Sequence, residues 1–137
     1  MSMDTLNKIS PYAHWLVRLS LAMTFLYHGP TKFPVADGLA NMMGMPVFLI
    51  YLLAAAETIG GILILWGGVG PDWATRVAGA IFVIVMLGAI FMVHFQNGWN
   101  FMAGWGEGTN KMGGMEFQTL IAVIAFYFLT HGNRVND

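Results

Sequence analysis

Glu57 is the only charged residue in the apolar run from Met45 to Trp66 (MPVFLIYLLAAAETIGGILILW). The run is close to the roughly 20 residues that an α-helix needs to cross the hydrocarbon core of a bilayer. A carboxyl near the middle of such a helix costs ~2.5 kcal/mol or more on insertion. The run therefore predicts a membrane-spanning helix, and Glu57 in it needs a partner, a proton or a functional role.

The composition of the chain indicates an integral membrane protein. Of the 137 residues, 57% are hydrophobic and 9% are charged, and the mean hydropathy is +0.64; an average soluble protein has roughly 25% charged residues. The length fits one domain, which we place over residues 1–137. The net charge of −1 without a basic cluster argues against nucleic-acid binding. Because the chain has no cysteine, thiol catalysis, disulfides and cysteine-ligated metals are excluded.

Four apolar segments predict an all-α integral membrane four-helix bundle with antiparallel up-down topology. The predicted spans are residues 11–31, 45–66, 73–96 and 115–131. The longest connection is an extended loop over residues 97–114 (NGWNFMAGWGEGTNKMGG), rich in glycine and tryptophan. It is interpreted either as an interfacial loop anchored by its tryptophans or as a lid over an opening in the bundle.

The balance of basic residues predicts the orientation. Four spans put both chain ends on one side of the membrane, with Lys8, Arg76, Arg134 and, just inside the first span, Arg18. The other side carries Lys32 and Lys111. The margin of one or two charges favours cytoplasmic termini, and we expect a multi-pass protein of the bacterial inner membrane.

Depth along the helices pairs two buried charges. At a rise of ~1.5 Å per residue, Arg18 lies about 10 Å and Glu57 about 14 Å from the same membrane face, on adjacent helices. A guanidinium–carboxylate pair neutralises both groups, so we predict a buried ion pair between Arg18 and Glu57. It is either a structural lock or a proton-active polar centre.

A second polar group is predicted at the opposite membrane face, below the extended loop. It gathers the ionisable ends of three spans, namely His28, Lys32, His94 and Glu116. Histidine can titrate near neutrality, lysine can hold an anion, and glutamate can accept a proton. These four are our candidate ligand-binding residues, and the alternative is four interfacial residues that meet lipid headgroups and water.

We predict no metal site in this chain. Eleven methionines fit an adaptable apolar interior and are a poor argument for a metal. His14 and His131 fall near one face and His28 and His94 near the other, which superficially resembles paired haem ligands. We rank haem low because helix ends would cover a porphyrin poorly.

Four segments, in this order and spacing, resemble the DoxX family of small four-helix membrane proteins. They are VRLSLAMTFLYHGPTKF (17–33), AAAETIGGILILWGG (54–68), Arg76 with the apolar run to HFQNGW (94–99), and GGMEFQTLIAV (113–123). The resemblance spans nearly the whole chain. It implies a four-helix bundle and these positions kept polar: Arg18, His28, Lys32, Glu57, Arg76, His94 and Glu116. The extension NFMAGWGEGTNKM departs from the shorter loop usual in the family.

The resemblance implies a quinone-linked or redox-associated membrane subunit, because some relatives are subunits of thiosulfate:quinone oxidoreductase. No cofactor belongs to the chain itself, and a quinone is the one that the resemblance leaves open. We therefore predict a subunit of, or accessory to, a redox membrane complex, in contact with lipid and with other subunits or copies of itself. The alternatives are a non-catalytic structural or assembly subunit and, third, a small transporter, for which broken helices and repeats are lacking.

Overall fold

A computed structural model describes residues 2–104 and 112–136, and every regular element in these ranges is helical. Four long helices form the body: α2 (Ala13–Lys32), α4 (Val47–Gly67), α5 (Asp72–Ala89) and α6 (Glu116–His131). Shorter elements are α1 (Met3–Ile9), α3 (Ala36–Met43) and the one-turn segments η1 (Ser10–Tyr12), η2 (Phe33–Val35), η3 (Ile90–His94), η4 (Phe95–Asn97) and η5 (Gly132–Asn136). The all-α class predicted from the sequence is confirmed.

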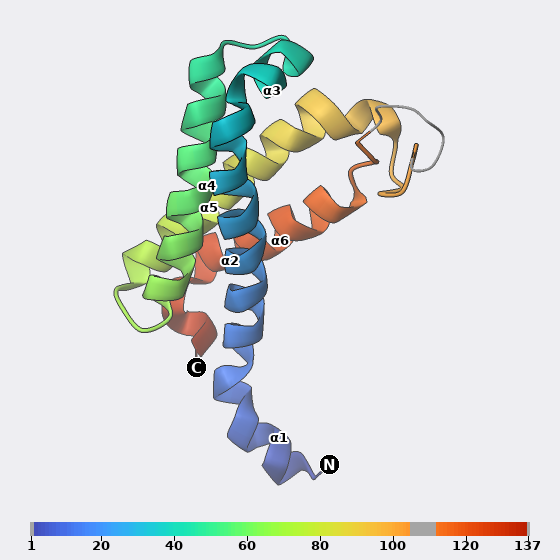
Figure 1. Ribbon diagram of the computed structural model, residues 1–137. Helices are drawn as coiled ribbons and strands as arrows, with labels where there is room; N and C mark the ends of the chain where they lie inside the picture. Colours follow the sequence, from blue (N-terminus) through green and yellow to red (C-terminus); the bar gives the residue numbers. More distant parts are fainter. Residues whose placement is uncertain (1, 105–111, 137) are drawn as a thin grey trace.

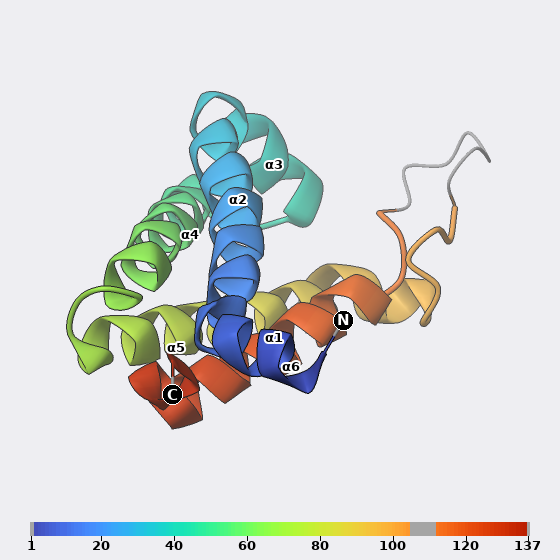
Figure 2. The same cartoon turned by 90° about the horizontal axis from the view of Figure 1, so that it is seen from below.

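The long helices are arranged as two antiparallel hairpins. The first pairs α2 with α4, joined through η2 and α3, and the second pairs α5 with α6; α4 packs on α5 to join them. The hairpins cross at a wide angle and diverge towards the end that carries α3 (Figure 1; Figure 2). Both chain ends lie at the opposite end of the molecule, and α1 projects beyond α2 there (Figure 1). The integral membrane four-helix bundle with antiparallel up-down topology therefore stays a prediction.

Length and composition single out two helices that could cross a membrane. They cover Val47–Gly67 and Asp72–Asn97, and both are strongly apolar. Helix α6 has 16 residues, fewer than the roughly 20 of a full span, and α2 includes Arg18 and Lys32. The spans predicted at 45–66 and 73–96 thus coincide with the two candidates, while the outer two remain predictions.

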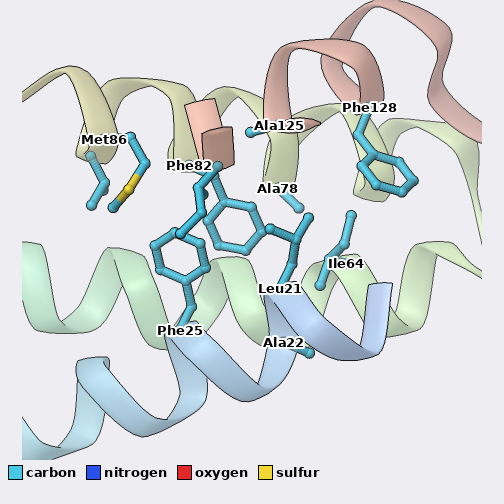
Figure 3. Close-up of a cluster of buried hydrophobic side chains, with 11 residues drawn as sticks. Leu21, Ala22, Phe25, Ile64, Ala78, Phe82, Met86, Ala125 and Phe128 are labelled. Atoms are coloured by element: carbon cyan, nitrogen blue, oxygen red, sulfur yellow. The ribbon is translucent and has the colours of Figure 1, made fainter. Parts of the chain in front are cut away.

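The core lies where the hairpins cross. Buried side chains from all four long helices meet there, including Leu21, Phe25, Ile64, Phe82 and Phe128 (Figure 3). The rings of Phe25 and Phe82 are stacked with centroids 3.8 Å apart. Helices α5 and α6 approach closely because Gly79 has no side chain, since a Cβ at this position would collide with the backbone of Leu129. Aromatic packing therefore joins the two hairpins where they cross, and the close approach at Gly79 holds α5 and α6 together within the second hairpin.

Candidate functional site

Glu57 pairs with Lys32. The Lys32 Nζ lies 2.5 Å from Glu57 Oε2, and the same ammonium donates to the carbonyl of His28 at 3.1 Å. The Glu57 side chain is 5% exposed and that of Lys32 is 20% exposed. The predicted Arg18–Glu57 pair is therefore wrong, although Glu57 does have a cationic partner on the first long helix.

The error lies in the relative level of the two helices. Arg18 Nη1 donates to the carbonyl of Ile64, and Trp15 lies against Gly68. Since Ile64 follows Glu57 by seven residues, Arg18 is about 10 Å from the level of Glu57. The depth estimate placed Pro11 level with the end of α4, whereas Trp15 occupies that level.

Arg18 instead occupies the centre of a polar network at the end of the molecule that carries both chain ends. Its side chain is fully buried. Its Nε donates to His14 Nδ1 at 3.0 Å, and Nη1 donates to Thr75 Oγ1 at 2.9 Å as well as to Ile64. Its Nη2 donates to Asn133 Oδ1 at 3.2 Å, which also accepts from Thr75 at 2.6 Å. One guanidinium thus joins α2, α4, α5 and the segment after α6.

A second arginine closes the neighbouring helix end. Arg76 pairs with Asp72 at 2.5 Å and donates to the last carbonyls of α6, those of Leu129, Thr130 and His131. The other Asp72 oxygen accepts from the backbone of Asn133 at 2.6 Å. Arg76 therefore caps α6 with donors that match its partially negative end.

Asn133 and Thr75 belong to the polar network around Arg18, and the sequence did not predict either of them. Both are neutral, and neither stands out in an apolar chain. The available signal was the spacing of Asp72 and Arg76, an acidic and a basic residue four positions apart that face each other on a helix. That pair marks the place where Asn133 docks.

His94 forms a separate polar cluster between α5 and α6. It ends the π-helical turn η3 and is buried at 8% exposure. Its Nδ1 lies 3.0 Å from the carbonyl of Gly113, which also accepts from Asn97 Nδ2 at 2.9 Å. Its Nε2 lies 3.0 Å from the amide nitrogen of Gln118. Because π turns recur at functional sites, this cluster supports His94 as a site candidate.

The hydrogen-bond network determines the tautomer of His94. The Gly113 carbonyl can only accept, so Nδ1 carries the proton and Nε2 accepts from the Gln118 amide. Gln118 Oε1 is then left buried with no hydrogen-bond partner. A buried acceptor of this kind is costly and needs an explanation, such as a donor brought by water or a ligand.

We expect histidine-selective ¹⁵N NMR of the protein in detergent micelles to show His94 protonated at Nδ1. The signal is assigned by its loss in His94→Gln, and the other three histidines serve as internal references. A signal typical of the Nε2–H tautomer at this position would contradict the assigned network.

Glu116 opens α6 beside an apolar hollow. The hollow has a volume of about 520 Å³ and is lined by Trp99, Phe101, Glu116, Phe117, Thr119, Leu120 and Val123. Glu116 Oε2 accepts from the backbone of Phe101, and the Glu116 backbone donates to the carbonyl of Trp99. These bonds hold the carboxyl against the aromatic wall.

The predicted outer group is divided between the two hairpins. His28, which is exposed, and Lys32 lie on α2, and Lys32 is engaged by Glu57. His94 and Glu116 lie at the ends of α5 and α6, on the other diverging hairpin (Figure 1). Among the described residues no hydrogen bond or ion pair links the two halves. The extended loop that was expected to cover them lies partly at residues 105–111, outside the described residues.

The described residues contain no group of three histidine, cysteine or acidic side chains that could hold a metal ion. The histidines considered for haem have other contacts. His14 accepts from Arg18, His94 contacts Gly113 and Gln118, and His131 lies against Tyr127 and Thr130. These contacts engage ring nitrogens of the three imidazoles within the protein.

Comparison with known proteins identifies the family. The family model described as DoxX matches residues 13–95, which is more than half of the chain. A protein of Bacillus subtilis (strain 168) named "putative oxidoreductase CatD" is 29% identical over 132 residues, covering 94% of this chain and 86% of that protein. No solved structure gives a significant match. This chain therefore belongs to the DoxX family, and its family and apolar helices make it a membrane protein.

Proposed function

We propose that this protein is a membrane subunit of, or accessory to, a redox complex, and that it binds a quinone headgroup in the hollow beside Glu116. The observation that carries the proposal is the combination, in one hollow, of an aromatic wall and a carboxyl. The similarity to a protein named as an oxidoreductase supports the redox association. The location we propose is the bacterial inner membrane, with four crossings and cytoplasmic termini.

The hollow matches the chemistry of a quinone ring. Its volume of about 520 Å³ lies in the range of small-molecule sites. Phe101, Phe117 and Leu120 offer apolar surface, and each is about half exposed. In a bilayer this surface faces lipid, so a lipid-soluble ring can enter the hollow from the hydrocarbon phase.

Polar groups at the edge of the hollow supply what the two redox states need. A quinone carbonyl only accepts hydrogen bonds, and the indole N–H of Trp99 is a donor that contacts no acceptor among the described residues. Reduction to the quinol consumes two electrons and two protons. A partner subunit supplies both electrons. Glu116 delivers the two protons one after the other, and water at the membrane interface reprotonates its carboxylate after each transfer. His94 contributes indirectly because its bond to Gly113 fixes the chain just before Glu116.

The proposal is tested by photolabelling in nanodiscs with an azidoquinone probe. We expect label on peptides covering residues 99–104 and 116–123, and its loss when excess decylubiquinone competes. Leu120→Trp, which fills the hollow, should lower labelling at least fivefold, and Glu116→Gln should weaken competition by decylubiquinone several-fold. The matched control is Phe126→Trp, because Phe126 is an exposed residue of α6 outside the hollow.

Labelling that decylubiquinone does not displace, or that Leu120→Trp leaves unchanged, would overturn the quinone site. It would favour the second candidate, an assembly subunit without a ligand. The observation behind that candidate is α1, which has no buried residue and projects beyond α2 (Figure 1), as a segment that contacts another subunit would.

A further inference from the structure

A hollow between the two hairpins is lined mainly by methionines. It has a volume of about 430 Å³ and is formed by Met42, Met43, Met92, Val93, Gln96, Asn97 and Met112. Four of these seven residues are methionines, whereas the whole chain has 11 among 137 residues. The four come from three separate parts of the chain, the end of α3, the π turn η3 and the segment before α6.

The number of methionines alone was a poor argument for a metal, but their grouping around one hollow is a different observation. Against the prediction of no metal site, we propose that this hollow binds one Cu(I) ion through methionine thioethers. Thioether sulfur is a soft ligand that selects Cu(I) over harder divalent ions. Because the chain has no cysteine, thioethers are the strongest soft ligands it can offer. This hollow shares no lining residue with the hollow beside Glu116 that we propose for the quinone, so the two sites are independent.

Three of the four methionines are too exposed to be packing residues, whereas Met43 packs against the small core of Ala36, Ala40 and Ile50. Met86 illustrates the packing role, since it lies in the core at 8% exposure. By contrast, Met42, Met92 and Met112 are 56%, 57% and 51% exposed. Methionine has three rotatable bonds in its side chain, so half-exposed thioethers can converge on an ion without disturbing the core.

The other groups at the hollow do not compete with the thioethers. Val93 is apolar, and the amide nitrogens of Gln96 and Asn97 donate to the Val93 carbonyl. Amide oxygens are hard ligands that bind Cu(I) weakly. Among the described residues, the lining contains no lysine or arginine to repel a cation. Neutral thioethers need lose no proton when the ion binds.

The experiment is a competition titration of the full-length protein in detergent with Cu(I) and the chromophoric chelator bicinchoninate. We expect one ion per chain, and at least a tenfold loss of affinity in the double variant Met42→Leu/Met92→Leu. Leucine conserves the volume and apolar character of methionine, so the fold is kept. The control is Met23→Leu, an exposed methionine of α2 outside the hollow, which should bind as the parent does.

Ag(I), which does not change oxidation state under these conditions, provides a second titration with the same expected pattern. X-ray absorption of the Cu(I) form should show sulfur neighbours only. The proposal is overturned if the protein leaves all Cu(I) on the chelator, if Met23→Leu loses as much affinity as the double variant, or if nitrogen neighbours dominate the spectrum.

Discussion

Arg18→Met is expected to destabilise the protein by about 3–5 kcal/mol, the range for removing one member of a buried charged network. Among the described residues the guanidinium donates to four acceptors on four parts of the chain, and methionine leaves all of them without that donor. Its stacking on Phe128, 4.9 Å from the ring centre, is also lost. The measurement is the free energy of unfolding from circular dichroism during titration with sodium dodecyl sulfate in mixed micelles.

Two further variants separate charge from geometry. Arg18→Lys retains a cation but offers a single nitrogen that cannot reach the same acceptors, so it should recover less than half of the lost stability. Arg134→Met is the matched control, because Arg134 is exposed and its hydrogen bonds to described residues go to backbone carbonyls of α6. It should change stability by less than about 0.5 kcal/mol. Equal stability of Arg18→Met and the parent would show that the network contributes nothing.

Lys32→Met is expected to cost about 2–3 kcal/mol, somewhat below the range for breaking a fully buried pair because Lys32 is partly exposed. The substitution leaves the buried Glu57 carboxyl without its cation. The double variant Lys32→Met/Glu57→Leu should recover most of this loss, since two apolar groups of similar volume need no partner. The same detergent titration measures both variants.

Comparing the stabilities of the single and double variants decides whether Lys32 and Glu57 act as a pair. Glu57→Leu alone should cost less than Lys32→Met, because Lys32 retains the His28 carbonyl and access to water. If the double variant is as unstable as the sum of the two single variants, Lys32 and Glu57 do not act as a pair.

Sequence reasoning could predict the helices because apolar runs and proline or glycine breaks are local signals. The two central helices match closely: the spans expected at 45–66 and 73–96 correspond to α4 (Val47–Gly67) and to the continuous run Asp72–Asn97. The sequence also predicted that Glu57 has a partner, since a lone carboxyl in such an apolar run is costly without one.

Which side chains pair between adjacent helices could not be predicted, because the sequence gives the relative axial position of two helices only to within a few helical turns. Glu57 pairs with Lys32 instead of Arg18 because contacts between α2 and α4, such as Leu26 against Gly61, set the relative position of the two helices along their axes. The sequence pattern of a single helix does not report such contacts. The prediction that His28, Lys32, His94 and Glu116 form one group did not hold for a related reason. Sharing a depth brings side chains together only if the helices converge, and here the hairpins diverge (Figure 1).

Regular helix geometry does predict one shared face. Arg76 and His94 are eighteen residues apart, five full turns of an ideal α-helix, which places two side chains on the same side. Both side chains face α6, because Arg76 donates to the carbonyls of Leu129, Thr130 and His131 and His94 contacts Gln118. The π turn at Ile90–His94 therefore leaves His94 on the α6 side of the helix.

The predicted crossing of the membrane by α6 would have a consequence for the surrounding lipid. Its 16 residues extend about 24 Å, whereas the hydrocarbon core of a typical bilayer is about 30 Å thick. Arg76 closes one end of the helix, and at the other end the backbone N–H of Glu116 bonds to the Trp99 carbonyl, so further turns cannot simply be added. A bilayer that accommodates α6 upright must thin by several ångströms on this side of the protein only. Such one-sided mismatch favours thinner membranes and attracts a neighbouring short helix to share the thinned patch.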